Sequence, residues 1–386
     1  MILEAFVIPR WIAVVLLCTT LSLAQTGPAS AVPAARPAHI RHGINLSEWF
    51  AQVWDPKGYT KQHFENWTTA SDIALIKSAG FDHVRLSINP QPMMDAMAHG
   101  KSADYFGYLD AAMKMILDAG LAVELDMHPD SDFKALLTKE DDAVERFADF
   151  WRTVAQHYAS YDPERVFFEI LNEPEFRDPY RWYGVEAKLA AAIRQAAPQH
   201  TIIATGANYG NDDDILFQEP LRDPNVIYVF HFYFPHIFTH QGATWGSYYW
   251  RWVKGLRYPS SPENAVQVAE RVPEAVDRLY VVRYGQDHWD ASRIEAEINQ
   301  AADWAKKNGV PLICNEFGVF RYGGADLQDR AAWIHDVRTA LEHHNIGWAM
   351  WDYSGSFSVV TKKDGKATPD ELTLKALGLK VPAETR

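Results

Sequence analysis

Two glutamates stand at the ends of two apolar runs that lie far apart in the sequence. The run that begins at Val166 ends in Glu173, and the run from Pro311 to Val319 contains Glu316. Burying an unpaired carboxylate is costly, so a buried strand that stops on a glutamate indicates a use for that charge. Two such carboxylates facing one cleft are the groups that a glycosidase needs if it retains the configuration of the anomeric carbon.

Cleavage of a glycosidic bond divides the work between two carboxyl groups. One must hold its proton near neutral pH to protonate the leaving oxygen, and the other must be ionised to attack the anomeric carbon. We expect Arg85 and Tyr233 beside Glu316, where ion pairing and hydrogen bonding would favour its charged form. Asn172 precedes Glu173 and is placed to hydrogen-bond the sugar 2-hydroxyl.

Polar or aromatic side chains also stand at most of the other expected strand ends. His128 and His231 could orient the carboxylates or bind hydroxyls, and Trp351 offers a flat apolar face for a sugar ring. A single histidine at a strand end is more often a structural group, so only the joint pattern indicates a site. The further polar groups at strand ends are Asn45, Glu48 and Asn208.

Short apolar runs alternate with amphipathic stretches from Ile40 onward, which predicts parallel strands connected by helices. The expected strands are 41–46, 83–88, 122–128, 166–172, 201–205, 226–233, 312–317 and 348–352. The expected helices are 69–79, 105–119, 141–158, 181–197, 292–308 and 328–344. Eight such units predict an α/β fold, a single (β/α)8 barrel with its site at the carboxyl ends of the strands. A doubly wound open sheet is the alternative, and the lack of a glycine-rich phosphate loop after the first strand counts against it.

One interval, residues 234–291, interrupts this alternation after the sixth expected strand. It is rich in Trp, Tyr and Pro, and we expect it to form part of the cleft wall, because loops at this end of a barrel carry function. For each aromatic residue taken singly, packing within the insertion's own small core is an equally good interpretation. The large aromatic residues of this stretch are Trp245, Tyr248, Tyr249, Trp250, Trp252, Tyr258 and Trp289.

The composition favours an exported enzyme with a neutral substrate. The 386 residues are 47% hydrophobic and carry a formal charge of −13, which argues against nucleic acid and anionic membranes as partners.

The amino-terminal sequence predicts export. Residues 1–24 resemble a signal peptide, with an apolar run from Trp11 to Leu23. Residues 25–38 are rich in Pro and Ala and are interpreted as a spacer, and residues 39–386 are expected to form the catalytic barrel. We therefore expect a secreted or periplasmic protein. Removal of Cys18 with the signal would leave Cys314 as a buried thiol without an internal disulfide partner.

The segment from Glu169 to Pro174, Glu-Ile-Leu-Asn-Glu-Pro, resembles the acid/base signature of glycoside hydrolase family 5, the cellulase-type family. The resemblance extends from about Ile40 to Leu377. It implies a retaining mechanism with Glu173 as acid/base and Glu316 as nucleophile, and an endo-acting β-1,4-glucanase. Glu175 departs from the pattern, which more often has His or Asn there, and it could alter leaving-side subsites or be a solvated loop charge. The supporting residues implied by the resemblance are Arg85, His128, Asn172, His231, Tyr233 and Trp351.

Several alternatives stay open at this point. The substrate could be another β-glycan, such as β-mannan, xyloglucan or a mixed-linkage glucan, and the enzyme could be an exo-acting β-glucosidase. A glycan-binding barrel without catalysis would not need both glutamates. A metal hydrolase is disfavoured because the histidines lack a metal-ligand spacing, and His343-His344 are interpreted as a solvated helix face. We expect no cofactor, no metal, a β-linked poly- or oligosaccharide as partner, no stable membrane association after signal removal, and a monomer.

Overall fold

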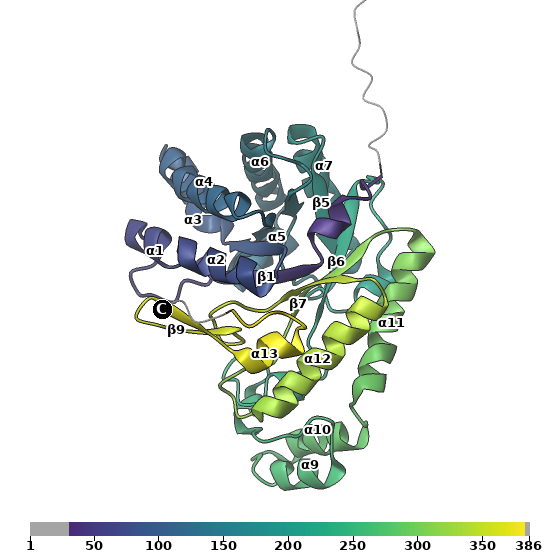
Figure 1. Cartoon of the computed structure of the whole chain (residues 1–386). Helices are drawn as coiled ribbons and strands as arrows, with labels where there is room; N and C mark the ends of the chain where they lie inside the picture. The colour runs from purple at the N-terminus through teal and green to yellow at the C-terminus, as the bar shows by residue number, and fades with distance from the viewer. Residues whose placement is uncertain (1–30, 383–386) are drawn as a thin grey trace, which may run out of the picture.

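Eight parallel strands close into a barrel surrounded by helices (Figure 1). The computed structural model describes residues 31–382, so the expected signal peptide, residues 1–24, lies outside the described part. Each strand pairs in parallel with the next, and the first pairs with the eighth to complete the barrel. The strands are β1 (His42–Phe50), β2 (His83–Ile88), β3 (Ala122–Met127), β4 (Val166–Glu169), β5 (Thr201–Thr205), β6 (Val226–Phe232), β7 (Leu312–Phe317) and β8 (Gly347–Met350).

The helices follow the strands in sequence, and most of them cover the outside of the barrel. They are α1 (Lys61–Asn66), α2 (Ala70–Ala79), α3 (Pro90–Ala98), α4 (Ser102–Asp118), α5 (Ser131–Lys139), α6 (Asp141–Tyr158), α7 (Pro179–Ala196), α8 (His236–Thr239), α9 (Pro262–Ala269), α10 (Ala275–Gln286), α11 (Ala291–Asn308), α12 (Leu327–His343) and α13 (Glu371–Ala376). Three 3-10 helices, η1 (Arg36–His39), η2 (Ile215–Phe217) and η3 (Tyr248–Trp252), and a two-stranded sheet of β9 (Val360–Lys363) and β10 (Lys366–Pro369) complete the described chain.

The predicted (β/α)8 barrel is confirmed, and the boundaries of β2, β5, β7 and α6 agree with the expected ones. The largest difference is at β1, which continues to Phe50 because Trp49 and Phe50 are buried among core aromatic residues. A second difference is at β4, which ends at Glu169 rather than at Asn172. The residues after it leave the regular ladder, and Glu173 has a φ of 43°.

The ends of two helices illustrate how local sequence sets these boundaries. Thr69 and Asp72 form a capping box at the start of α2, so backbone donors of the first turn have partners. The same helix ends at Gly80 with a φ of 106°, and α11 ends at Gly309 with a φ of 65°. Glycine adopts this left-handed conformation without a steric penalty, which explains the stop signals expected from the sequence.

The inside of the barrel changes from apolar to charged along its axis. Toward the amino ends of the strands, a small cluster that includes Ile40, Phe167 and Ile313 fills the interior. Toward the carboxyl ends, Arg85 and Glu169 are buried in place of apolar side chains. Buried charges require ion pairs and hydrogen bonds, so this layer must be held by mutual contacts. It forms the floor of the candidate site.

The last part of the expected spacer, residues 25–38, belongs to the folded unit. Arg36 opens η1 and is buried, with its Nε 2.9 Å from Oε1 of Glu164 and its Nη1 2.7 Å from the carbonyl oxygen of Gln199. The expected boundary at residue 38 is therefore too late. The error has a physical reason: an arginine in a Pro/Ala-rich stretch resembles a solvated charge until its partners, 128 and 163 residues away, are known.

The insertion after β6 begins against the site and then extends away from the barrel, where α9 and α10 lie at the lower edge of Figure 1. His240, at its start, packs against Tyr233 and Phe357, with ring centroids 5.2 and 5.4 Å away. Tyr258 and Trp289 are buried and belong to the main core cluster. Trp245, Tyr248 and Trp252 keep about half of their surface exposed. The aromatic residues thus divide between a core and an open surface.

Among the helices of residues 31–382, none combines the length and apolarity needed to cross a bilayer.

Candidate active site

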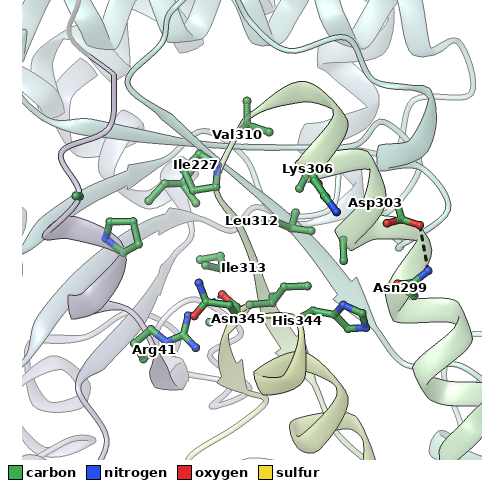
Figure 2. A pocket seen from close by; sticks show the side chains of 17 residues that line it. Arg41, Ile227, Asn299, Asp303, Lys306, Val310, Leu312, Ile313, His344 and Asn345 are labelled. Atoms are coloured by element: carbon green, nitrogen blue, oxygen red, sulfur yellow. Dashed lines mark hydrogen bonds between the residues drawn. The ribbon is translucent and has the colours of Figure 1, made fainter.

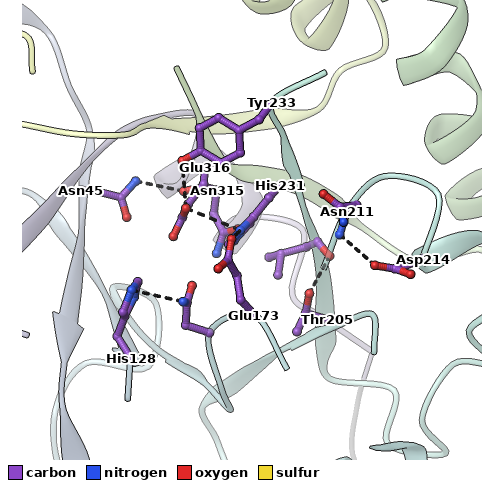
Figure 3. A network of polar contacts seen from close by, with 12 residues as sticks. Asn45, His128, Glu173, Thr205, Asn211, Asp214, His231, Tyr233, Asn315 and Glu316 are labelled. Atoms are coloured by element: carbon purple, nitrogen blue, oxygen red, sulfur yellow. Dashed lines mark hydrogen bonds and ion pairs between the residues drawn. The ribbon is translucent and has the colours of Figure 1, made fainter. Parts of the chain in front are cut away.

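The carboxyl ends of the strands bring the two predicted glutamates together (Figure 3). Glu316 lies in β7, and Glu173 follows the end of β4. One carboxylate oxygen of each and one ring nitrogen of His231 all lie within 4.8 Å of one another. The side chain of Glu316 is 5% exposed and that of Glu173 is 30% exposed. The site therefore combines an enclosed carboxylate with one that solvent reaches.

Glu316 is held by three side chains, all of which the sequence predicted as site residues. Nη1 of Arg85 lies 2.6 Å from Oε1, and the hydroxyl of Tyr233 donates to Oε2 over 2.9 Å. Nδ1 of His231 lies 3.5 Å from the same Oε2. Burial, followed by the charges of Glu316 and Glu173, raises the pKa of Tyr233 well above its usual value, so its hydroxyl keeps its proton. A cation and a hydrogen-bond donor thus both favour the carboxylate form of Glu316.

Arg85, on β2, is the centre of the buried network. Its Nε and Nη2 donate to the two carboxylate oxygens of Glu169 over 2.7 and 2.8 Å, a bidentate pair. Nη2 also donates to Oδ1 of Asn172 over 2.9 Å and lies 3.1 Å from Asp126. Burial alone would lower the pKa of Arg85, but Asp126, Glu169 and Glu316 raise it well above its usual value. Arg85 is therefore a permanent cation beneath the site.

Glu173 is paired with His231. Nδ1 of His231 lies 3.0 Å from Oε1 of Glu173. Burial by itself would raise the pKa of Glu173, but the hydrogen bond and the charge of His231 lower it to about 2. Burial would lower the pKa of His231, but Glu316 and Glu173 raise it above its usual value. These shifts favour His231 as the protonated member of the pair and Glu173 as the carboxylate.

His128, which follows β3, supports the neighbouring amide. Its Nδ1 lies 2.8 Å from Oδ2 of Asp126, and its Nε2 lies 3.1 Å from Nδ2 of Asn172. Burial, with further effects of Arg85 and Lys134, lowers the pKa of His128 to about 3, so the ring is neutral. A neutral ring with Nδ1–H donating to Asp126 leaves Nε2 to accept from Asn172. His128 thereby fixes which way the amide of Asn172 points.

Trp351, after β8, forms the wall of the site next to Glu316. It belongs to a small apolar cluster with Tyr233 and Phe357, and Phe320 packs against this cluster. Its ring lies nearly parallel to that of His128, with centroids 5.4 Å apart and an angle of 14° between the planes. The indole is thus fixed in orientation. Stacking of a sugar ring on it stays a prediction.

Four buried residues of this network were not singled out from the sequence. Asp126 and Glu169 pair with Arg85, and Nδ2 of Asn315 donates to Glu169 over 3.1 Å and to Glu124 over 2.9 Å. Burial, then the charge of Glu169, raises the pKa of Glu124 well above its usual value, so Glu124 is protonated. A signal was available, because charged residues interrupt the apolar runs of β3 and β4.

The site network is the better place for sugar chemistry than the cavity at the other end of the barrel. That cavity, of about 650 Å³, lies among the amino ends of the strands and α11 (Figure 2). Its lining includes Arg41, Ile227, Lys306 and Asn345. Barrel enzymes place their chemistry at the carboxyl ends of the strands, and the two close carboxylates are there.

Two groups of described residues place three potential metal-ligand atoms within 4.8 Å of one another. One is Glu173, His231 and Glu316, in which Nδ1 of His231 hydrogen-bonds to Oε1 of Glu173 and lies 3.5 Å from Oε2 of Glu316. The other joins Glu295 of α11 to His343 and His344, each with a ring nitrogen 2.7 Å from Oε1 of Glu295. The interpretation of the two histidines as a purely solvated face is therefore wrong for His344, which is 17% exposed and paired.

Comparison with known proteins decides the family. The family model described as cellulase, glycosyl hydrolase family 5, matches residues 47–356. The chain belongs to glycosyl hydrolase family 5. The protein is thus a glycosyl hydrolase, as the strand-end glutamates predicted.

Similar proteins cover most of this chain. Endoglucanase C of Acetivibrio thermocellus is 30% identical over 340 residues, which are 86% of this chain and 96% of that protein. Endoglucanase 3 of Fibrobacter succinogenes is 28% identical, over 88% of this chain and 53% of that protein. Thermotoga maritima Cel5A in complex with mannotriose is 27% identical with a TM-score of 0.70, over 89% of this chain and 98% of that chain. The same enzyme in complex with cellobiose has 26% identity, a TM-score of 0.67 and the same coverage.

Proposed function

We propose that this family 5 enzyme is a retaining endo-β-1,4-glucanase with Glu316 as nucleophile and Glu173 as acid/base. The observation that carries the proposal is the separation of the two carboxylates, with one oxygen of each within 4.8 Å. Retaining glycosidases hold their carboxyls about 5–5.5 Å apart, whereas inverting enzymes need about 6.5–9.5 Å to admit a water. The short separation supports direct attack by Glu316 on the sugar.

In the first step, Oε2 or Oε1 of Glu316 forms a bond to the anomeric carbon while the bond to the leaving oxygen breaks. Glu173 gives its proton to that oxygen, so the leaving sugar departs as an alcohol. In the second step, Glu173 takes a proton from water, the water oxygen attacks the anomeric carbon, and the carboxylate of Glu316 is released. Two inversions at one carbon give net retention. Asn172, fixed by Arg85 and His128, faces the 2-hydroxyl in this scheme.

The acid step requires the shared proton to move from His231 to Glu173. The path is the 3.0 Å contact between Nδ1 and Oε1. A sugar chain bound over the site displaces water from Glu173, the more exposed member of the pair. Loss of water disfavours the separated charges of the imidazolium and the carboxylate, so the proton shifts to Oε1. We infer that substrate binding itself converts Glu173 into an acid.

Endoglucanase is the printed name of the Acetivibrio and Fibrobacter relatives, which supports a β-1,4-glucan as the substrate. A β-mannan is the second candidate, because the Thermotoga relative has been solved with mannotriose as well as with cellobiose. The two polymers differ in the orientation of the 2-hydroxyl, the group that Asn172 faces in our scheme.

A product analysis tests the assignment. The purified enzyme is incubated with carboxymethyl cellulose, β-mannan, xyloglucan, mixed-linkage glucan and xylan, and product lengths are followed over time. We expect the β-glucans to be cut, with a rapid fall in viscosity and a spread of oligosaccharides, and proton NMR to show β-anomers first. Initial α-anomers would contradict retention, and release of single sugars from the start would contradict endo action.

We also propose export, with residues 1–24 as the signal peptide, 25–38 as an approximate spacer, and the catalytic barrel following. Because η1 begins at Arg36, the folded part starts slightly before residue 39. Expression of the full chain in a bacterium and mass spectrometry of the amino terminus in the periplasmic and culture fractions test this. An uncleaved protein confined to the cytoplasm would contradict it.

A further inference from the structure

A buried lysine lies close to the loop that carries Glu173. Lys134 is on α5, its side chain is 5% exposed, and its Nζ lies 3.3 Å from Oε1 of Glu175. Ser131, at the start of the same helix, donates from Oγ to the same oxygen over 2.7 Å. Glu175 is thus not the solvated loop charge considered from the sequence. A lysine is rarely buried without an ion partner, so the pair has a structural requirement to stay together.

The loop is also fixed from its other side. The backbone N–H of Tyr209 donates to the carbonyl oxygen of Pro174 over 2.9 Å, and that of Phe176 donates to Ala207 over 3.2 Å. Glu175 forms an isolated bridge with Asn208. The segment after Glu173 is therefore held between α5 and the loop that follows β5. Such support is needed because Glu173 itself has a φ of 43°, a conformation that costs energy for any residue but glycine.

We propose that Lys134 and Glu175 are positioning residues for Glu173: they fix the loop that carries it and set the balance of charge around its proton. This inference rests on the proposed role of Glu173 as acid/base. Residue 175 is where this chain departs from the family pattern. In this proposal, Glu175 forms an ion pair with Lys134 rather than a contact with the sugar.

The charges that face Glu173 come from several elements. The cation of Lys134 favours the carboxylate of Glu173. The anion of Glu175, two residues further along the chain, opposes it by charge repulsion. Because Lys134 and Glu175 carry opposite charges, each offsets part of the other's effect on Glu173, and loss of either one removes that offset. The titratable groups that face Glu173 are His231, Glu316, His128, Tyr233, Tyr209, His236, His240, Lys134 and Glu175.

Removing Lys134 or Glu175 one at a time should therefore shift the pH dependence of kcat/KM in opposite directions. In Lys134→Met, the uncompensated anion of Glu175 favours the proton shared by Glu173 and His231. The basic limb of the kcat/KM profile, where that proton is lost, should move up by about half a pH unit or more. In Glu175→Gln, Lys134 acts on Glu173 without the opposing anion of Glu175. The basic limb should then move down by a similar amount, and the double variant should return toward the wild type.

Two substrates distinguish a specific effect on the positioning of Glu173 from a general disruption of the active site. An aryl cellobioside with a dinitrophenolate leaving group needs no protonation, whereas a cello-oligosaccharide does. On the oligosaccharide, kcat of both single variants should fall by about tenfold or more, with little change in KM. On the aryl glycoside, the fall in kcat should be much smaller. Lys134→Arg should restore most of the activity. Lys139→Met, an exposed lysine on the same helix, is the matched control and should behave as the wild type.

A measurement without substrate keeps this inference separate from the proposed function. The ring of His231 is titrated by NMR in the free wild type and in the variants, and its midpoint should move up in Lys134→Met and down in Glu175→Gln. Shifts of the same sign in both variants, or none, would overturn the inference even in an active enzyme. An enzyme with these NMR shifts that cleaves no β-glycan would instead overturn the proposed function.

Discussion

The imidazole of His231 lies between the two carboxylates, with Nδ1 3.0 Å from Oε1 of Glu173 and 3.5 Å from Oε2 of Glu316. A single ring nitrogen thus contacts both groups that the proposed mechanism uses. Two carboxylates this close would repel each other if both were ionised without a cation between them. In the proposed mechanism, the imidazolium of His231 offsets this repulsion and supplies the proton that Glu173 gives to the leaving oxygen.

Replacing the nucleophile should abolish turnover without abolishing binding. Glu316→Gln keeps the size of the side chain and an oxygen that can accept from Arg85, but it removes the attacking carboxylate. We expect kcat on carboxymethyl cellulose to fall by about three orders of magnitude or more. The affinity for cello-oligosaccharides, measured by calorimetry, should change by less than about tenfold. Hydrolysis at the wild-type rate would show that Glu316 is not the nucleophile.

Replacing the acid should produce a loss that depends on the leaving group. Glu173→Gln removes the proton donor, so hydrolysis of cello-oligosaccharides should fall by about 10²–10⁴-fold. Formation of the glycosyl-enzyme from dinitrophenyl cellobioside should be nearly unaffected, and a burst of dinitrophenolate should appear because the second step then lacks its base. Added azide should raise the turnover by attacking the intermediate. Equal losses on both substrates would contradict the assignment.

Removing Arg85 should destabilise the protein as well as inactivate it. Arg85→Met leaves the buried carboxylates of Asp126, Glu169 and Glu316 without their cation, although Glu124 beside them is already protonated. Loss of one partner of a buried ion pair costs about 3–5 kcal/mol, which urea denaturation at pH 7 would measure. Arg146→Met removes an exposed arginine, and we expect it to change the unfolding free energy by less than about 0.5 kcal/mol.

A buried histidine away from the site should make stability depend on pH. Burial, with the charges of Arg36 and Arg194, lowers the pKa of His200 from 6.5 to about 4. The unfolded chain therefore takes up a proton below pH 6.5 that the folded protein does not, so this contribution to stability is present above pH 6.5 and is lost as the pH falls toward 4. His200→Phe keeps a ring against Phe168 but removes the titration.

The check is the unfolding free energy of the wild type and of His200→Phe at pH 7, 6, 5 and 4. Relative to the variant, the unfolding free energy of the wild type should fall by about 1–3 kcal/mol as the pH falls from 7 to 4, at up to about 1.4 kcal/mol per pH unit. His335→Asn, an exposed histidine on α12, is the control and should run parallel to the wild type. A constant difference between the wild type and His200→Phe would show that His200 titrates normally.

Much of the site could be predicted because the local sequence indicates where each strand ends. Arg85 lies within β2, whereas the other predicted residues lie at or just after the carboxyl ends of barrel strands: His128, Asn172, Glu173, His231, Tyr233, Glu316 and Trp351. The structure brings these side chains together. Apolar runs define the strands, and parallel strands in a closed barrel must direct those ends to one face. Neither step needs more than the local pattern.

The partners of the side chains could not be predicted in this way. Glu169 and Asp126 resemble ordinary strand charges until the closed barrel places them around Arg85. Glu175 resembles a loop charge until α5 places Lys134 beside it, 41 residues back along the chain. Arg36 resembles part of a spacer until its contacts with Glu164 and Gln199 are known. These contacts depend on the stagger of the strands and on the docking of helices, which the local sequence does not encode residue by residue.

Glu173 and Glu316 illustrate what the sequence determines and what the tertiary structure determines. The sequence by itself determined that both are glutamates at the ends of apolar strands in a chain of alternating strands and helices. Only the tertiary structure decided that their oxygens lie within 4.8 Å, that His231 stands between them, and that Glu316 is enclosed while Glu173 is more open. The physical reason is that residue type and periodicity are local properties. The distance between two charges, which sets their protonation and their chemistry, is fixed only when the barrel closes.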